Sequence, residues 1–271
     1  MFRRIVLLGL VVLCLLSACA PKEEVLTIAT IPTEDSELTS REMHQPFLDY
    51  MEERTGMKVE LLTVVDYSAV VEAMKYGHAD IAKFGPLNYV QAAEEVDLEL
   101  LVVSVKPSSG TPFYKSFIIS RVDLETLEGA SFAYVDPGSM SGYGAPSVYI
   151  RDNGIQLGEI VFAGSHPAVI EAVKNGSVDA GAISDSRWLA ALEAGVITTD
   201  ALKVFAESDP IAAGPWVASA DMDPELRNVI LQAFLDMPED ISVALGSMHT
   251  DFVPAHEEDF DVIKKVWEAM D

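Results

Sequence analysis

A run of small and hydroxyl-bearing residues in the middle of the chain has the composition of an anion receptor. The run YVDPGSMSGY spans Tyr134 to Tyr143 and reads as a short apolar strand, a Pro-Gly turn and the start of a helix. Ser139 suits the N-cap position, where its oxygen accepts a hydrogen bond from an amide of the first turn. The amides that follow it, with the hydroxyls of Ser139 and Ser141, could bind a tetrahedral oxyanion. The same residues also fit an ordinary capped helix, since such caps are common.

Other strand-to-helix turns carry polar groups that would lie at the same end of a sheet. Asp66 is a helix cap followed by Tyr67, whose ring could equally belong to the core with its hydroxyl satisfied. Phe84-Gly85-Pro86 forms a second turn, because proline suits the first position of a helix. Tyr114 is expected to enter the second half of the fold close to a hinge. Several such turns that converge in a cleft would offer many donors to one oxyanion.

His166 precedes Pro167 at the expected start of a further helix, after Gly164 and Ser165. A helix N-terminus disfavours a cation, so the imidazole is expected to be a neutral donor, or else a plain cap. Two cations could add charge to the same site. Lys83 is either a solvated lysine or a direct partner of the anion, and Arg187 is either a ligand-facing cation or a surface salt-bridge partner.

An enzyme is the weaker interpretation. Ser139 or Ser141 with His166 and Asp136 could be cast as a hydrolase triad. However, the serine is not in a Gly-x-Ser-x-Gly elbow. The chain has no Walker A sequence, dinucleotide fingerprint or paired-histidine zinc motif, so no catalysis, cofactor or metal is expected. The remaining histidines show no metal-ligand spacing: His44, His78, His249 and His256.

The elements that would position these residues alternate between strand and helix. Strands are expected at 25–31, 57–64, 79–84 and 100–105, then at 114–120, 131–135, 160–162, 178–183, 203–206 and 215–219. Helices are expected at 40–54, after Asp66, after Gly85, after Ser139, and at 167–175, 185–193, 224–237 and 259–270. This alternation predicts an α/β fold with parallel, doubly wound sheets.

Two similar lobes are expected, with a ligand cleft between them near the carboxyl ends of the strands. The linker by composition is KPSSGTP, at residues 106–112. The predicted boundaries are 19–107 for the first part of lobe 1, 108–208 for lobe 2, and 209–271 for the return to lobe 1 with the C-terminal helices.

The N-terminus predicts export. Arg3 and Arg4 precede an apolar run over 5–16, which is too short for a permanent transmembrane helix. LSAC at 16–19 resembles a bacterial lipobox, which implies a signal peptide at 1–18 and a lipid on Cys19. A plain secretory signal with a chance cysteine is the alternative. Since Cys14 would leave with the signal, the mature chain would hold no free thiol, and a sizeable hydrophobic core must stabilise it.

The charge limits the partners. The chain of 271 residues has a formal net charge of −25, which disfavours nucleic acid and anionic lipid as partners. An anionic ligand is still compatible with this charge, because oriented amides in a desolvated pocket can outweigh distant, salt-screened carboxylates.

On these motifs the chain resembles the phosphate/phosphite/phosphonate-binding proteins of bacterial ABC importers. The likeness covers nearly the whole mature chain, and the Asp-Pro-x-Ser-x-Ser-Gly-aromatic core at 136–143 is its most specific part. The resemblance implies the two-lobed, type II periplasmic binding protein fold, which closes on its ligand about a hinge.

The resemblance also implies a set of ligand contacts. The family's phosphonate clamp would fall on Tyr67, Tyr114, Ser139, Ser141 and His166, and Gly142 closes the same motif. Met140 stands where the family has a threonine, which removes a hydroxyl and leaves the identity of the anion open. Relatives that bind aminoethylphosphonate hold acidic residues where this chain has Arg187 and Gly214, so a ligand without a cationic tail is expected.

The sequence therefore predicts a lipid-anchored, monomeric, extracytoplasmic protein on the periplasmic side of a membrane. It would capture phosphate, phosphite or a short alkylphosphonate and deliver it to an ABC permease and its ATPase. The alternative is a sensor component that reports a related oxyanion to a membrane histidine kinase. A third interpretation is a pocket for a carboxylate or an arsenic or sulfur oxyanion, with Lys83 and Arg187 supplying charge.

Overall fold

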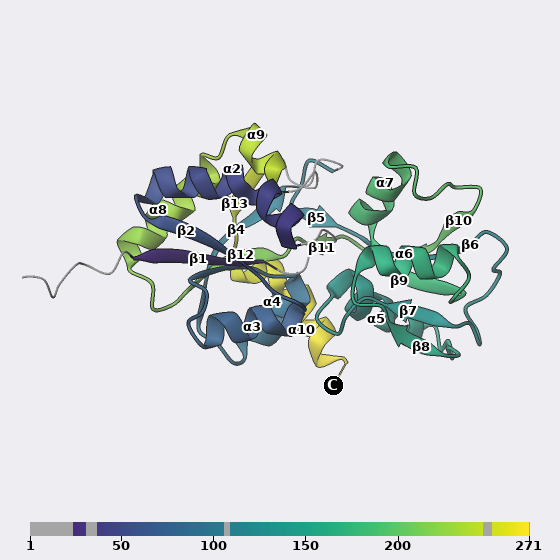
Figure 1. Cartoon of the computed structure of the whole chain (residues 1–271). Coiled ribbons are helices and arrows are strands. Elements are labelled where there is room, and N and C mark those ends of the chain that lie inside the picture. Colours follow the sequence, from purple (N-terminus) through teal and green to yellow (C-terminus); the bar gives the residue numbers. More distant parts are fainter. Residues whose placement is uncertain (1–23, 31–36, 106–108, 246–250, 271) are drawn as a thin grey trace, which may run out of the picture.

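The computed structural model describes residues 24–30, 37–105, 109–245 and 251–270 (Figure 1). The expected signal peptide, Cys19 and the first three residues of the expected linker lie outside these ranges. Within them, no helix is long and apolar enough to cross a bilayer. The same residues contain no group of three or more histidine and acidic side chains that could hold a metal ion.

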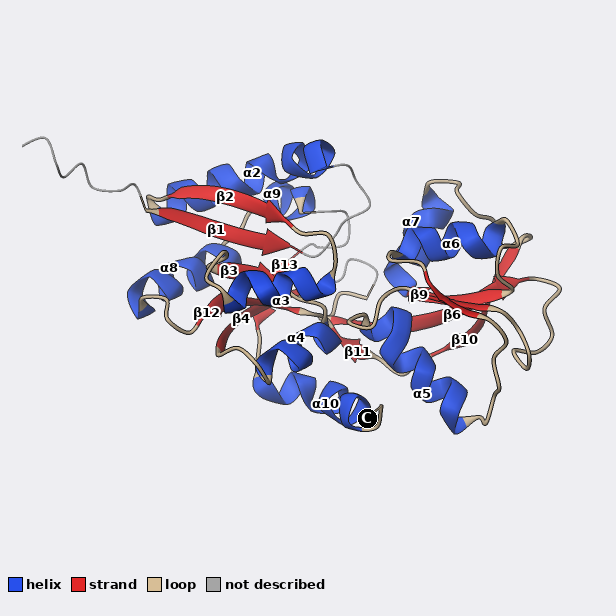
Figure 2. Ribbon diagram, turned by 60° about the horizontal axis from the view of Figure 1, so that its bottom comes forward, coloured by secondary structure: helices blue, strands red, loops and turns tan. Residues whose placement is uncertain are grey.

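Lobe 1 is built on a six-stranded sheet with the order β13-β4-β12-β3-β1-β2 (Figure 2). Its strands are β1 (Val25–Thr30), β2 (Lys58–Thr63), β3 (Ile81–Lys83), β4 (Leu98–Val105), β12 (Pro215–Ser219) and β13 (Asp251–Pro254). One face packs on α2 (Glu37–Thr55), α8 (Pro224–Leu235) and α9 (Glu239–Ala244). The other face packs on α3 (Tyr67–Lys75), α4 (Pro86–Ala93) and α10 (Asp261–Glu268), which follows the short turn η2 (Glu257–Phe260). Two apolar clusters, one on each face, stabilise this lobe.

Lobe 2 is built on a five-stranded sheet with the order β10-β6-β9-β7-β8. Its strands are β6 (Ser116–Arg121), β7 (Phe132–Tyr134), β8 (Ile160–Phe162), β9 (Ala180–Ser184) and β10 (Leu202–Glu207). Helices α6 (His166–Lys174) and α7 (Asp185–Glu193) pack on one face. The π-helical turn η1 (Met140–Gly144) and α5 (Ala145–Asp152) lie against the other face.

Two short antiparallel strands connect the lobes (Figure 1). β5 (Phe113–Tyr114) leads out of lobe 1, and β11 (Ile211–Ala212) leads back into it, with Tyr114 opposite Ile211. The sequence predicted one strand over 114–120, but Tyr114 belongs to this crossing, whereas the lobe 2 strand begins at Ser116. The α/β, two-lobed fold is confirmed.

The expectation that both sheets are parallel is wrong, because each sheet is mixed. β12 runs antiparallel to both β3 and β4, and β13 runs antiparallel to β4. In lobe 2, β6 runs antiparallel to β9 and to β10. A parallel neighbour requires a long crossover connection. The chain instead returns from lobe 2 through β11 and enters β12 without an intervening helix, so β12 does not come from a strand–helix–strand crossover within lobe 1. β11, β13 and α9 were not expected from the sequence.

Local capping rules did predict how the site-bearing helices begin. Asp66 accepts a hydrogen bond from the Ala69 amide at 2.8 Å and so caps α3. Ser165 accepts one from the Ala168 amide at 3.3 Å and caps α6. Gly77 follows the end of α3 with a φ of 67°, a conformation that only glycine adopts at little cost.

Candidate functional site

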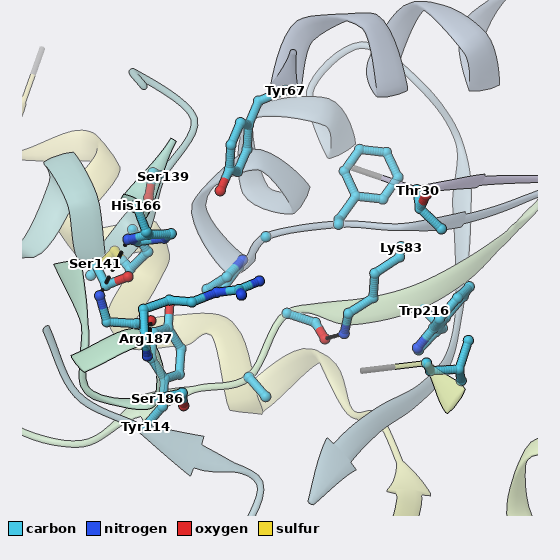
Figure 3. Close-up of a pocket in the computed structure, with 18 of the residues that line it drawn as sticks. Thr30, Tyr67, Lys83, Tyr114, Ser139, Ser141, His166, Ser186, Arg187 and Trp216 are labelled. Carbon is cyan, nitrogen blue, oxygen red and sulfur yellow. Dashed lines mark hydrogen bonds between the residues drawn. The ribbon is translucent and has the colours of Figure 1, made fainter. Parts of the chain in front are cut away.

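A cavity of about 180 Å³ lies between the lobes (Figure 3). Its described lining includes Thr30, His44, Tyr67, Lys83 and Trp216 from lobe 1, Tyr114 from the crossing strands, and Ser139, Met140, Ser141, His166 and Arg187 from lobe 2. Eight of the nine candidate ligand-binding residues named from the sequence are therefore brought together in one space. Gly142 is the exception.

The hydroxyl-rich run forms a tight turn that presents Ser139 and Ser141 to the cavity. The Asp136 carboxylate accepts a hydrogen bond from the Gly138 amide at 2.7 Å, and its carbonyl accepts one from the Ser139 amide at 2.9 Å. Ser139 Oγ then accepts one from the Gly142 amide at 3.0 Å, which is the expected cap. The helix opens as a wide turn, since the Gly144 amide donates to the Ser139 carbonyl, five residues back, at 3.1 Å.

Gly142 has a structural role that explains its absence from the lining. Its carbonyl accepts a hydrogen bond from the Val135 amide at 3.0 Å, while its own amide is held by Ser139. A Cβ at this position would lie 2.4 Å from Val135 Cγ2 and 2.8 Å from Ser139 Oγ. Only glycine fits here without displacing the Ser139 cap. Gly142 therefore packs against Val135, on the side of the turn away from the cavity.

Two tyrosines, one from lobe 1 and one from the crossing strand β5, point their hydroxyls toward these serines. The Tyr67 hydroxyl lies close enough to the Ser139 side chain, and the Tyr114 hydroxyl to the Ser141 side chain, for each serine to oppose the rise in that tyrosine's pKa. Burial has the larger effect, so it raises the pKa of Tyr67 to about 12 and likewise raises the pKa of Tyr114. Both phenols therefore remain protonated donors at neutral pH.

The Tyr67 ring also marks the contact between the lobes. A Cβ at Gly138 of lobe 2 would lie 2.8 Å from the Tyr67 Cβ, and one at Gly85 would lie 3.2 Å from the Tyr67 Cε1. Met140, 4% exposed, belongs to the apolar cluster of lobe 1 although the chain places it in η1 of lobe 2. The lobes thus meet beside the candidate anion site through two contacts. Gly138 of lobe 2 packs against Tyr67 of lobe 1, and Met140 of lobe 2 packs in the apolar cluster of lobe 1.

His166 reaches the cavity from the first position of α6. Its Nδ1 accepts a hydrogen bond from the Ser184 amide at 3.3 Å, so the proton of the neutral ring is on Nε2. Burial, followed by the charge of Arg187, lowers its pKa from 6.5 to about 3. The ring is therefore a neutral donor at physiological pH, as the helix N-terminus suggested.

The two candidate cations line the cavity from opposite lobes (Figure 3). Arg187 lies in the first turn of α7, where Ser184 Oγ accepts a hydrogen bond from its amide at 3.3 Å, and its side chain extends into the cavity. Lys83, the last residue of β3, donates from Nζ to the Gly214 carbonyl. No aspartate or glutamate is among the described residues that line this space. The cavity is therefore locally positive in a strongly acidic chain.

The arrangement does not form a hydrolase triad. A triad histidine donates its Nδ1 proton to a carboxylate. Here Nδ1 accepts a hydrogen bond from Ser184, and the Asp136 carboxylate accepts one from the Gly138 amide.

Sequence reasoning did not identify seven of the described lining residues, namely Thr30, His44, Ser184, Ser186, Ala213, Trp216 and Leu245. Thr30 and Trp216 reach the cavity through cross-strand pairing with Lys83, which is a long-range relationship. The turn from β9 into α7, with Ser184 as its cap, carried a readable signal in the sequence SDSR.

Two lobes on separate sheets, joined by two crossing strands around a cavity that holds hydroxyls, an imidazole and two cations, define a type II solute-binding protein. The sequence profile described as "ABC transporter, phosphonate, periplasmic substrate-binding protein" matches residues 28–260. The phosphate-import protein PhnD of Mycolicibacterium smegmatis is 31% identical over 229 residues, which cover 78% of this chain and 71% of that protein. The chain belongs to this family of periplasmic substrate-binding proteins of ABC transporters.

Further relatives agree with this assignment. A probable phosphite-binding protein, PhnD1 of Prochlorococcus marinus, is 23% identical over 231 residues, 77% of each chain. The solved structure of PhnD1 from that organism in complex with methylphosphonate superposes with a TM-score of 0.81 at 19% identity, covering 92% of this chain and 99% of that one. At this identity the structural likeness shows the shared fold.

Proposed function

We propose that this protein binds a small phosphorus oxyanion, namely phosphate, phosphite or a short alkylphosphonate, and delivers it to an ABC permease with its ATPase. The observation that carries the proposal is the convergence of donors on one end of the cavity. Ser139, Ser141, Tyr67, Tyr114 and the Nε2 proton of His166 face a common space. A tetrahedral oxyanion there would exchange its water shell for these donors and the amides of the η1 turn.

Arg187 would supply charge to the same end. Its guanidinium lies in the cavity beside this donor set (Figure 3), and it already lowers the pKa of His166. A charged donor strengthens a hydrogen bond to an oxyanion about twofold relative to a neutral one. Binding an oxyanion without any chemical step is enough to explain the presence of each of these donors and of Arg187.

Lobe closure would be the mechanism of capture. We propose that two bodies move relative to each other. Lobe 1 comprises 19–107 and 209–271, lobe 2 comprises 108–208, and β5 and β11 form the hinge between them. Tyr67 on one lobe and Ser139 on the other would then make their contacts with the ligand only when the lobes are together. We further propose that the mature protein is a monomer, exported and held on the periplasmic side of its membrane by a lipid on Cys19.

Calorimetry on the mature protein tests the ligand class. Phosphate, phosphite, methylphosphonate and aminoethylphosphonate would be titrated, with sulfate and acetate as controls. We expect saturable binding of at least one of the first three and weaker binding of aminoethylphosphonate. Binding of sulfate alone, or of none of the phosphorus compounds, would overturn the proposal. Labelling with radioactive palmitate in cells, comparing wild type with Cys19→Ala, tests the anchor separately.

A further inference from the structure

Three side chains form a row across lobe 1 at the end of the cavity opposite Ser139 and Ser141 (Figure 3). β1, β3 and β12 are adjacent strands, in which Thr30 pairs with Lys83 and Lys83 pairs with Trp216. Directly paired residues of neighbouring strands project from the same face of a sheet. This face is the one covered by α2, because Trp216 packs against Phe47 of that helix with ring centroids 5.7 Å apart.

Two atoms of this row are buried without a hydrogen-bond partner in the described part of the chain. They are Thr30 Oγ1 and Trp216 Nε1, on side chains of residues that are 5% and 2% exposed. Leaving a buried polar group unsatisfied is costly, and such groups are rare in folded proteins. Both residues line the cavity, so a ligand bound there would be placed to satisfy these atoms. The indole N–H is a donor only, so its partner must be an acceptor.

Lys83, on the strand between those of Thr30 and Trp216, adds a positive charge to the row. Its ammonium donates to the Gly214 carbonyl and lies 5.8 Å from the centre of the Trp216 ring. A hydroxyl, an indole N–H and an ammonium side by side favour an oxygen acceptor with negative charge. The Lys83 ammonium would repel an ammonium group on a ligand. This donor row is separate from the Ser139 end and lies on the other lobe.

We propose that the row of Thr30, Lys83 and Trp216 is a second subsite, which binds a carboxylate on the organic substituent of the phosphorus ligand. The inference rests on the proposed function, since it assumes that the phosphoryl group occupies the Ser139 end. It changes the expected ligand from an unsubstituted alkylphosphonate to a carboxylated phosphonate that spans the two lobes. Such a ligand would make one set of contacts with each lobe and so favour the closed state.

Calorimetry with matched ligands tests the subsite. Phosphonoacetate and 3-phosphonopropionate carry the carboxylate at two distances, and ethylphosphonate and propylphosphonate are their uncharged counterparts. We expect at least one carboxylated ligand to bind about tenfold or more tightly than its alkyl counterpart, as a charge-assisted hydrogen bond predicts. We expect aminoethylphosphonate to bind more weakly than ethylphosphonate.

Substitutions locate the effect. Thr30→Val removes the hydroxyl at nearly constant shape, and Trp216→Phe removes the indole N–H together with part of the ring. Both should lower the preference for the carboxylated ligand several-fold and leave the affinity for methylphosphonate unchanged. Ser104→Ala is the matched control, because Ser104 Oγ is also buried without a partner in the described residues but does not line the cavity. It should change neither affinity, and thermal unfolding would verify that each variant folds.

The outcomes separate this inference from the proposed function. Binding of methylphosphonate with no preference for a carboxylate would overturn the subsite and leave the proposed function standing. A preference that survives both Thr30→Val and Trp216→Phe would also overturn it. If no phosphorus compound binds, both proposals fail together.

Discussion

The imidazole of His166 accepts a hydrogen bond from the backbone amide of Ser184, with 3.3 Å between Nδ1 and the amide nitrogen. This contact fixes which ring nitrogen is protonated. Burial and the charge of Arg187 lower the pKa of this imidazole to about 3, so the donor whose ordinary pKa lies closest to neutral pH is held in its neutral form. The site therefore offers His166 as a fixed dipole whose charge does not change near neutral pH.

The first prediction concerns the pH dependence of stability. The unfolded chain protonates His166 near the ordinary histidine pKa of 6.5, whereas the folded chain does so only near 3. Stability from this group is therefore fully present above pH 6.5 and is lost as pH falls toward 3. The slope reaches at most about 1.4 kcal/mol per pH unit. Urea unfolding from pH 4 to 7 should show a flatter profile for His166→Gln than for wild type. Parallel profiles would contradict the assigned neutral state.

The second prediction separates the two roles of Ser139. Its Oγ caps the η1 turn and also faces the cavity. Ser139→Ala should cost about 1 kcal/mol of stability as a lost cap, and should also reduce oxyanion affinity about tenfold or more. Ser165→Ala is the matched control, since Ser165 caps α6 but does not line the cavity. It should lose similar stability and keep its affinity. Equal affinity in the two variants would show that Ser139 is only a cap.

The third prediction concerns closure. A methyl group at Gly138 would lie 2.8 Å from the Tyr67 Cβ, across the boundary between the lobes. Gly138→Ala should therefore weaken ligand binding about tenfold or more, because it opposes the closed arrangement while leaving the core of each lobe intact. Small-angle X-ray scattering with ligand should show a larger radius of gyration than for wild type. Wild-type affinity would contradict the closed contact.

The fourth prediction concerns Met140, which lines the cavity and packs in the apolar cluster of lobe 1. Met140→Thr exchanges this packing for a hydroxyl beside the anion. We expect a loss of about 2 kcal/mol in stability, and a shift of about tenfold in relative affinity toward phosphate over methylphosphonate. Leu87→Val is the control, because Leu87 belongs to the same cluster but not to the cavity lining. The same shift in both variants would point to loosened packing as the cause.

The parts of the site that follow local rules were predictable from the sequence. Asp66, Ser139 and Ser165 each cap a helix as expected, since a cap is decided within four residues. Helix α7 begins at the expected residue for the same reason, and strands β8 and β12 also have the expected bounds.

What the sequence could not predict depends on pairing between distant segments. The row of Thr30, Lys83 and Trp216 exists because β12 enters the sheet antiparallel, after the chain has traversed all of lobe 2. Gly142 was expected to contact the ligand but does not line the cavity. It packs against Val135 instead, a neighbour that local rules did not predict.

A crystal structure of the mature protein with methylphosphonate tests the central claim most directly. The account predicts phosphonate oxygens within hydrogen-bonding distance of the Ser139 and Ser141 side chains, of both the Tyr67 and Tyr114 hydroxyls, and of His166 Nε2. It also predicts that the lobes stay together over the ligand. Methylphosphonate bound outside this cavity, or held without contact to Ser139 and His166, would contradict the account.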